Sequence, residues 1–170
     1  MFLVKMSSQY FNLWFRLDAC DAYLIWFNGE PDGVITNADG KVPCFQSTKD
    51  LLSYASSLNL AVETEEPILF DLDILDSWLN AKDNEAVDCK IFLDSWNLFD
   101  DVSRSVSGNF DTNRKLTAKI YDKLFWGSNI SVVTPVGKSY EPIWTKRELK
   151  VMQKVLGVGL SLFIEKISCV

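Results

Sequence analysis

Two adjacent runs between residues 10 and 27 constrain the fold of this chain more than any other feature. From Tyr10 to Leu17, Phe or Leu occupies every second position, which is the period of a half-buried β-strand. Residues 22–27 (AYLIWF) are continuously apolar, as in a central strand. Residues 18–21 contain two aspartates and separate the two runs as a turn. We therefore expect two antiparallel strands at the centre of a sheet.

Further turn sequences predict that this sheet continues as an antiparallel meander. The turns are expected at residues 28–29 (NG), 32–33 (DG) and 37–40 (NADG). They leave room for short strands at residues 33–36 and 41–45. Ser47, with Asp50 three residues later, has the pattern of a helix N-cap. Residues 60–64 are expected to return to the sheet edge as another short strand.

The second half of the chain has the periodicity of helices. We expect helices over residues 71–80, 85–106 and 113–126, and a last helix that begins at Thr145. Asp71 is a suitable N-cap for the first of them, and Thr145 with Glu148 forms a capping box for the last. Residues 130–136 are rich in β-branched side chains and predict a short strand. Together these elements predict an α+β fold: an N-terminal antiparallel sheet with helices, followed by a mainly helical C-terminal half.

Length and composition favour one globular domain that spans residues 1–170. The chain is 48% hydrophobic and contains six Trp, five Tyr and eleven Phe, which is enough for a substantial core. Four cysteines without a CxxC pair, and an N-terminal apolar run too short for a signal peptide, predict reduced thiols and a cytoplasmic protein. The chain has no histidine, which excludes His-dependent catalytic triads and the usual zinc sites.

Charge is distributed unevenly along the chain. Residues 63–101 contain twelve acidic and two basic residues, whereas residues 102–170 contain five acidic and eleven basic residues. A strongly negative segment predicts a surface that meets a cationic partner, because charge complementarity speeds association. The acidic balance of the whole chain, −6, argues against direct binding to nucleic acid.

The acidic segment supplies most of the candidate partner-binding residues. On a helix over residues 71–80, Asp73, Asp76 and Asn80 fall on one side and form an acidic ridge. Trp78, near this ridge, is a candidate for the apolar anchor that a tight interface needs. The full set of predicted partner-binding residues is Glu63, Glu65, Glu66, Asp71, Asp73, Asp76, Trp78, Asp94 and Asp101.

Other readings of the same residues remain open. Residues 71–76 (DLDILD) resemble a calcium loop only superficially, since they lack its glycine and downstream glutamate, and we expect no metal or cofactor. Asp100 and Asp101 would suit a carboxylate-dependent hydrolase, but adjacent helical residues point about 100° apart. A second apolar stripe on the last helix, made of Val151, Val155, Val158 and Leu162, would suit a structural or scaffold subunit.

Several segments resemble bacterial immunity proteins of contact-dependent growth inhibition and related polymorphic toxin systems. The resemblance covers roughly residues 20–150 and rests on four segments: YLIWFNGEPDGVITNADGKVPCFQSTKDLLSYASSLNL, EPILFDLDILDSWL, YDKLFWGSNI and YEPIWTKREL. It implies a cytoplasmic protein that binds and neutralises the C-terminal toxin domain of its own kin. We expect such a protein to be no enzyme and to act as a monomer in a 1:1 complex. Such toxins are often nucleases, and RNase-A-like enzymes are one kind. The resemblance identifies no individual binding residue.

The charge distribution agrees with what the resemblance implies. A nuclease must present a cationic groove to hold phosphates. An inhibitor that offers carboxylates in place of those phosphates gains charge-assisted hydrogen bonds and fast association. The expected partner is therefore a basic toxin domain, which the acidic segment binds directly.

Overall fold

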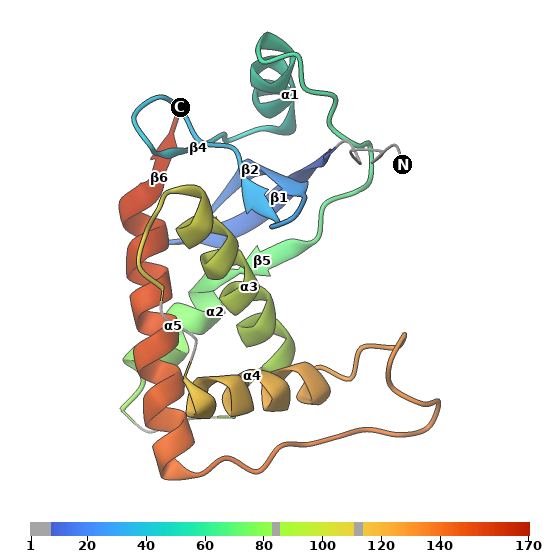
Figure 1. The fold of residues 1–170 in the computed structure, drawn as a ribbon, viewed down its shortest axis with the longest axis vertical. Coiled ribbons are helices and arrows are strands. Elements are labelled where there is room, and N and C mark those ends of the chain that lie inside the picture. Colours follow the sequence, from blue (N-terminus) through green and yellow to red (C-terminus); the bar gives the residue numbers. More distant parts are fainter. Residues whose placement is uncertain (1–7, 83–85, 111–113) are drawn as a thin grey trace, which may run out of the picture.

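The hairpin predicted from residues 10–27 forms the two central strands of the main sheet (Figure 1). The computed structural model describes residues 8–82, 86–110 and 114–170. Its main sheet has four strands in the order β3 (Gly33–Val34), β2 (Cys20–Asn28), β1 (Gln9–Leu17) and β5 (Leu69–Asp71). β1, β2 and β3 run antiparallel, as expected. β5 pairs parallel to β1, so the sheet is mixed and the expectation of a purely antiparallel sheet is wrong in this respect.

The hairpin is held by its register and its turn. Leu13 lies opposite Leu24 and Phe15 opposite Ala22, so the apolar residues of both strands share one face. Asp18 and Ala19 form the turn with φ angles of 52° and 56°. Positive φ at both central residues is typical of the two-residue turn whose twist matches that of the strands.

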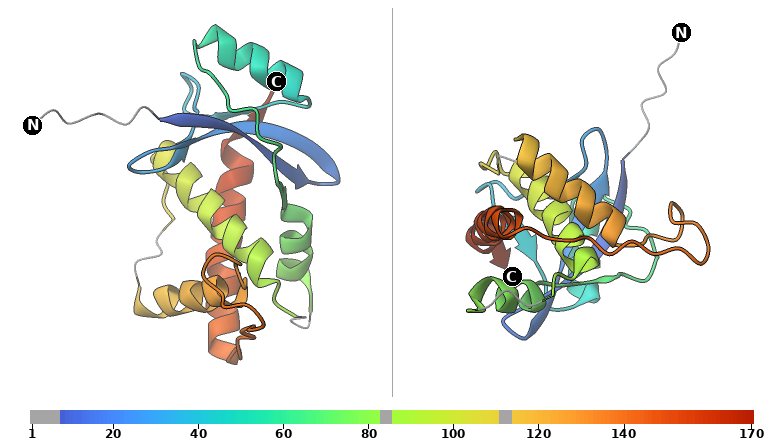
Figure 2. Two further views of the ribbon diagram at one scale, coloured as in Figure 1. Left: turned by 90° about the vertical axis from the view of Figure 1, so that its right-hand side faces the viewer. Right: turned by 90° about the horizontal axis from the view of Figure 1, so that it is seen from below.

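Both faces of the sheet are covered. The face that carries Leu13 and Phe15 packs against the helices of the C-terminal half. On the opposite face, Ile25 packs with Phe45 and with two residues of α1 (Thr48–Ser57). Figure 2 shows the sheet between α1 on one side and the other helices on the opposite side. The continuous apolar run in β2 is explained by this double coverage.

The described part of the C-terminal half is built from the helices α2 (Leu72–Asn80), α3 (Cys89–Ser105), α4 (Lys115–Gly127) and α5 (Lys146–Lys166). α3 is apolar around most of its circumference and packs against the sheet, α4 and α5. α5 approaches α3 closely at Gly159, where an added Cβ would lie 2.3 Å from the ring of Phe99. The α+β fold class is confirmed.

The chain ends in a strand that the sequence analysis missed. β6 (Ile167–Cys169) follows α5 directly and pairs in parallel with β4 (Val42–Cys44). Residues 41–45 therefore do not continue the meander, apart from one bridge between Tyr23 and Phe45. Three-residue strands are too short to show a hydrophobic period, so the sequence does not indicate them or their partners. Because β6 follows α5 directly, the packing of α5 decides where β6 pairs.

Some expected boundaries were wrong. Residues 130–136 form turns and not a strand, and the Val132 and Val136 side chains are exposed. Residues 60–64 contribute a single bridge, between Val62 and Tyr10. The helix predicted over residues 85–106 begins after Asp88. Its expected start at Glu85 lies outside the described residues, as do residue 113 and the N-terminal apolar run.

No helix in the described part of the chain has the length and apolar character needed to cross a membrane.

Candidate functional site

The acidic segment does not form one surface, because several of its carboxylates are used by the fold. Asp71 caps α2: one carboxylate oxygen accepts hydrogen bonds from the backbone N–H groups of Asp73 (3.2 Å) and Ile74 (3.4 Å). The other oxygen lies 3.8 Å from Nη1 of Arg16. Capping explains Asp71 without a partner protein.

Asp73 is also used internally. Its two carboxylate oxygens accept hydrogen bonds from the backbone N–H groups of Asp18 (2.7 Å) and Ala19 (2.9 Å). These two residues form the β1–β2 turn, so Asp73 ties α2 to the hairpin. The expected ridge is thereby reduced to Asp76, whose carboxylate accepts a hydrogen bond from Nδ2 of Asn80 at 3.0 Å.

Trp78 is not the surface anchor that the sequence analysis suggested. Its side chain is 5% exposed, and its ring packs edge-on against Phe92 with 4.8 Å between the ring centroids. The ring belongs to the core because Trp78 shares the apolar face of α2 with Leu72 and Leu75. The amphipathic pattern of α2 already contained this signal.

Several other acids of the segment lie in a groove between α3, the β1–β2 hairpin and the chain segment that leads into β5. We call this hollow the acidic groove; its volume is about 640 Å³. Among the described residues, six carboxylates line it together with one cation, Arg104. These acids are Asp32, Glu65, Glu66, Asp94, Asp100 and Asp101. The structure thus brings together four predicted partner-binding residues (Glu65, Glu66, Asp94 and Asp101) and adds two that were not predicted as binding residues.

Apolar and aromatic side chains form the rest of the acidic groove. Phe11, Trp26 and Phe70 line it from the sheet, and Tyr121 lines it from α4. Ile68 is 69% exposed although it is large and aliphatic. Exposed apolar groups surrounded by charged groups are typical of a protein interface. Sequence reasoning missed these residues because they come from four separate segments.

The floor of the acidic groove is a fixed ion cluster. Arg104 pairs with both Asp100 and Asp101 through its two terminal nitrogens. Trp26 Nε1 donates a hydrogen bond to the other oxygen of Asp101 at 2.8 Å. The two adjacent carboxylates therefore do converge, on a guanidinium group, although their positions on the helix point apart. The long, forked side chain of Arg104 makes this possible.

Burial is the largest influence on the pKa of Asp101. The side chain is buried, which raises the pKa of its carboxyl group, whereas the Trp26 hydrogen bond and the charge of Arg104 lower it; burial dominates, and the net pKa is raised. Both oxygens have partners in the fold. Asp101 is therefore part of the floor of the acidic groove. A cationic ligand would meet the outer carboxylates first.

Glu65 and Glu66 are the most accessible acids of the acidic groove. Both are exposed, on the irregular segment before β5, and neither forms an ion pair within the described residues. Asp94 is half-buried, and Nζ of Lys90 lies 2.7 Å from its carboxylate. Glu63 lies outside the groove, near Gln9, whose Nε2 is 3.5 Å from its carboxylate. Glu65 and Glu66 are therefore the residues most available to a partner.

Within the part of the chain that the structure describes, no three Cys, Asp or Glu side chains are arranged to hold a metal ion.

Comparisons with known proteins show similarity at the level of the fold. No family model matches the sequence, and no curated protein matches it. The C-terminal domain of SatS, whose crystal structure was determined in complex with bromine, has a similar fold, with a TM-score of 0.51. The two chains are 12% identical, and the match covers 99% of this chain and 97% of the SatS domain. At this identity the likeness concerns the fold alone.

Proposed function

We propose that this protein is an immunity protein that binds and neutralises a basic toxin domain through the acidic groove. The main observation is the convergence of six carboxylates and several aromatic side chains in one hollow. A cationic surface that normally grips phosphates would meet carboxylates here, and exposed apolar groups such as Ile68 would supply desolvated contacts. The resemblance of the sequence to immunity proteins supports the same proposal.

The toxin that this proposal favours is a nuclease, for which RNase-A-like enzymes are one example. Nuclease active sites are rich in Lys and Arg because they hold a polyanion. We propose a cytoplasmic 1:1 complex in which the immunity protein is not an enzyme. It would cover the cationic groove of the toxin and compete with its nucleic-acid substrate.

A carboxylate-dependent hydrolase is the less favoured alternative. It would need carboxyl groups that reach a substrate, one as an acid and one as a base. Asp101 has a raised pKa, but both of its oxygens are already bonded to Trp26 and Arg104. Asp100 shares Arg104 with it. This arrangement suits a rigid binding surface better than proton transfer.

The test begins with the neighbouring gene. We expect a large open reading frame beside this one, whose C-terminal domain is basic and arrests growth when expressed alone. Co-expression of the present protein should restore growth and give a 1:1 complex in size-exclusion chromatography with light scattering. A toxic domain that is not neutralised, or a neighbourhood without such a gene, would contradict the proposed function.

Charge reversal assigns the surface. The triple variant Glu65→Lys, Glu66→Lys and Asp94→Lys changes three acids of the acidic groove and should slow association about tenfold or more, because rim charges act mainly on the association rate. The control triple, Asp39→Lys, Asp122→Lys and Glu141→Lys, makes the same change in net charge at exposed positions outside the groove. If both triples protect cells equally well, the groove is not the interface.

A further inference from the structure

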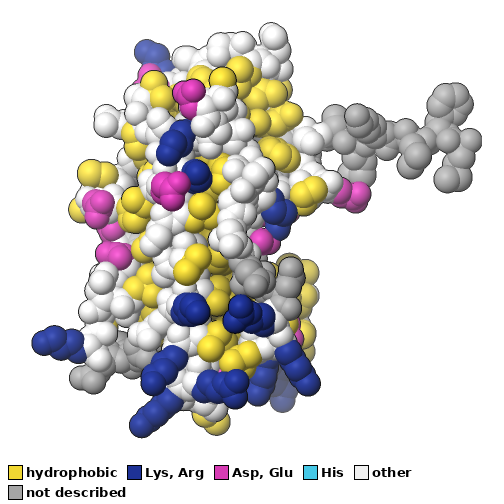
Figure 3. All heavy atoms as spheres, turned by 60° about the vertical axis from the view of Figure 1, so that its left-hand side comes forward, with side chains coloured by type: hydrophobic (Ala, Val, Ile, Leu, Met, Phe, Trp, Pro, Cys, Tyr) yellow, Lys and Arg dark blue, Asp and Glu magenta, His cyan; other side chains and the backbone are white. Residues whose placement is uncertain are grey.

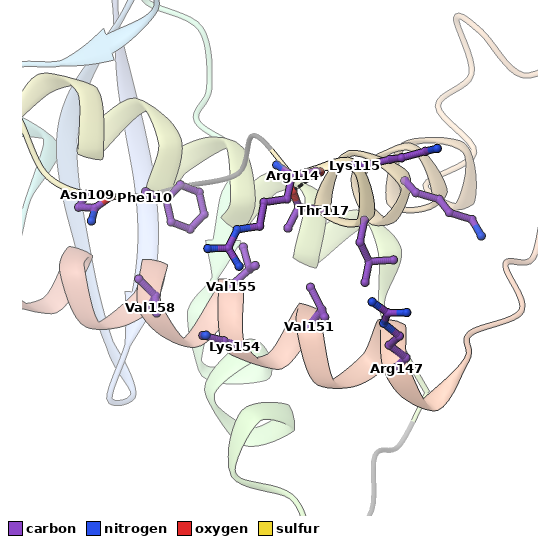
Figure 4. Close-up of a pocket in the computed structure, with 12 residues that line it drawn as sticks. Asn109, Phe110, Arg114, Lys115, Thr117, Arg147, Val151, Lys154, Val155 and Val158 are labelled. Carbon is purple, nitrogen blue, oxygen red and sulfur yellow. Dashed lines mark hydrogen bonds between the residues drawn. The ribbon is translucent and has the colours of Figure 1, made fainter.

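A second groove lies between α4 and α5, on residues that the proposed function does not use. We call it the basic groove; its volume is about 760 Å³ (Figure 4). Its apolar floor consists of Phe110, Leu116, Val151, Val155 and Val158. The three valines are most of the second stripe noted in the sequence of the last helix. Met152 and Leu156, on the other face of α5, are fully buried. Of the three valines, Val151 and Val155 are partly buried against the core, and Val158 is exposed.

The rim of the basic groove is cationic. Arg114, Lys115, Lys119, Arg147 and Lys154 line it, and none of the described lining residues is acidic. Lys115, Arg147 and Lys154 form no ion pair within the described part of the chain. In Figure 4 the side chain of Arg114 reaches from the start of α4 towards Val155. Figure 3 shows the dense cluster of Lys and Arg side chains, with apolar side chains between them, at the end of the molecule where α4 lies.

One nearby carboxylate is turned away from the basic groove. Glu148 lies in the first turn of α5 but is 2% exposed. It accepts hydrogen bonds from the backbone N–H of Thr145 (2.9 Å) and from Lys123 Nζ (2.9 Å), and Lys119 Nζ lies 3.6 Å from its other oxygen. The fold thus withdraws the acid and leaves the cations at the surface.

The combination of a cationic rim and an aliphatic floor indicates the kind of ligand. Single-stranded nucleic acid needs exposed aromatic rings on which bases stack, but the floor has one aromatic ring, Phe110, which is 8% exposed. A bilayer is broad and cannot enter a hollow between two helices. A second copy of this chain offers its acids in another hollow, and two concave surfaces do not fill each other. An amphipathic helix, in contrast, presents a convex apolar stripe flanked by charges.

We propose that the basic groove binds an acidic amphipathic helix of a partner protein. Val151, Val155 and Val158 are spaced by four and three residues, so the floor extends for about 10 Å along α5, or two helical turns. The partner helix would place apolar residues at spacings of three and four on this floor. Its Asp or Glu side chains would pair with Arg147, Lys154 and Lys115 at the rim. The inference is independent of the proposed function, because the two grooves have no described residue in common.

The test uses a synthetic probe and the full-length protein. The probe is a fluorescently labelled helical peptide of about 15 residues, with Leu on one face and Glu elsewhere; a second peptide carries Lys in place of every Glu. Fluorescence anisotropy at low salt should show saturable binding of the acidic peptide, at least tenfold tighter than that of the basic peptide. Equal binding of the two peptides, or none, would overturn the proposal.

Matched variants locate the binding site. The pair Arg147→Glu and Lys154→Glu should weaken binding of the acidic peptide about tenfold, whereas Lys138→Glu with Lys150→Glu, which lie outside the groove, should change it less than about twofold. Val158→Glu on the floor should abolish binding, and Val132→Glu on the exposed 130–136 segment should not. Val158 is 46% exposed, so its replacement leaves the core intact. Binding that ignores these changes rejects the basic groove as the site.

The alternative ligands are outcomes of the same experiment. A labelled oligothymidylate or vesicles of anionic lipid that bind more tightly than the acidic peptide, and lose binding in the Arg147→Glu and Lys154→Glu pair, would replace the proposal with a nucleic-acid or membrane surface. Self-association in analytical ultracentrifugation that the same pair abolishes would replace it with a homomeric contact. A monomer that binds only the acidic peptide supports the proposal as stated.

Discussion

The acidic groove and the basic groove differ in how the fold treats their charges. In the acidic groove, Asp100 and Asp101 are held by Arg104, and Asp94 is paired with Lys90, so much of the charge is balanced within the chain. In the basic groove, Lys115, Arg147 and Lys154 have no counter-ion among the described residues, because the nearby acid, Glu148, faces inward.

The comparison shows that charge in the sequence and charge on the surface are different quantities. Residues 63–101 carry the largest charge excess in the sequence, yet Asp71 and Asp73 serve as a helix cap and a turn clamp. Residues 102–170 carry a smaller excess of the opposite sign, and several of its cations line one groove. A buried or bonded charge contributes little to what a partner meets.

Replacement of Glu148 has the largest expected effect on stability. Burial alone would raise the pKa of this carboxyl group, but hydrogen bonds from Thr145 and Lys123 lower it from its usual 4.5 to about 2. Glu148→Gln keeps the shape and removes the charge, so we expect a loss of about 3 kcal/mol in the free energy of unfolding at pH 7. Urea unfolding followed by circular dichroism measures this loss.

The pH dependence of that loss identifies its cause. Because the folded pKa is depressed, the contribution of Glu148 is fully present above about pH 4.5 and disappears as the pH falls towards about 2. The difference between the parent and Glu148→Gln should therefore shrink over this interval. A difference that stays constant with pH would mean that packing, and not the ion cluster beside the basic groove, is responsible.

Asp73 tests the acids that the fold withdraws from the acidic surface. Asp73→Ala removes two hydrogen bonds to the β1–β2 turn, and we expect it to lower the free energy of unfolding by about 2 kcal/mol. Glu66→Ala, at an exposed position of the acidic groove, should change it by less than about 0.5 kcal/mol. Equal effects in thermal unfolding would remove the distinction between structural and available acids.

Two glycines of α5 test how firmly the floor of the basic groove is supported. A Cβ at Gly159 would meet Phe99 at 2.3 Å and Phe110 at 2.9 Å, so Gly159→Ala should destabilise the protein by about 1 to 2 kcal/mol. At Gly157 nothing lies within 4 Å of the added atom, and Gly157→Ala should stabilise by about 1 kcal/mol through helix propensity. Opposite signs in chemical denaturation are the expected result; a Gly159→Ala variant as stable as the parent would contradict the close α3–α5 contact.

Trp26 tests the floor of the acidic groove, with the smallest expected effect. Trp26→Phe removes the donor to Asp101, and we expect a loss of about 1 kcal/mol at pH 7. The change should also raise the pKa of Asp101 further, because burial then acts with one fewer opposing hydrogen bond. The loss should therefore diminish as the pH is lowered through the pKa of Asp101, where the protonated group no longer needs the donor. A pH-independent loss would show that Asp101 is not coupled to Trp26.

Features made by neighbouring residues were predictable. The hairpin register agrees with the alternation in residues 10–17. The N-cap at Ser47 was predicted from Asp50 three residues later, and the hydroxyl of Ser47 accepts a hydrogen bond from the backbone N–H of Asp50 (3.1 Å). The capping box of Thr145 and Glu148 is present as predicted. Each of these depends on contacts within a few positions, where the local conformation decides the outcome.

Features that depend on residues distant in the sequence could not be predicted. Residues 130–136 have the composition of a strand but form turns. β4 and β6, in contrast, show little hydrophobic alternation, yet they pair with each other although they are far apart in the sequence. Trp78 was given a surface role although its own periodicity placed it in the core. Pairing and burial depend on which surfaces meet, and that depends on the packing of all the helices.

The amino-acid sequence by itself determined the hairpin, the caps, the amphipathic helices and the uneven distribution of charge, because each of these is a property of residues close together in the chain. The tertiary structure decided which carboxylates face outward, brought Glu65, Glu66, Asp94 and Asp101 into one groove with Asp32, and placed three valines of α5 in another groove under a cationic rim. These choices depend on long-range packing, since a side chain becomes part of a site only when the elements around it meet.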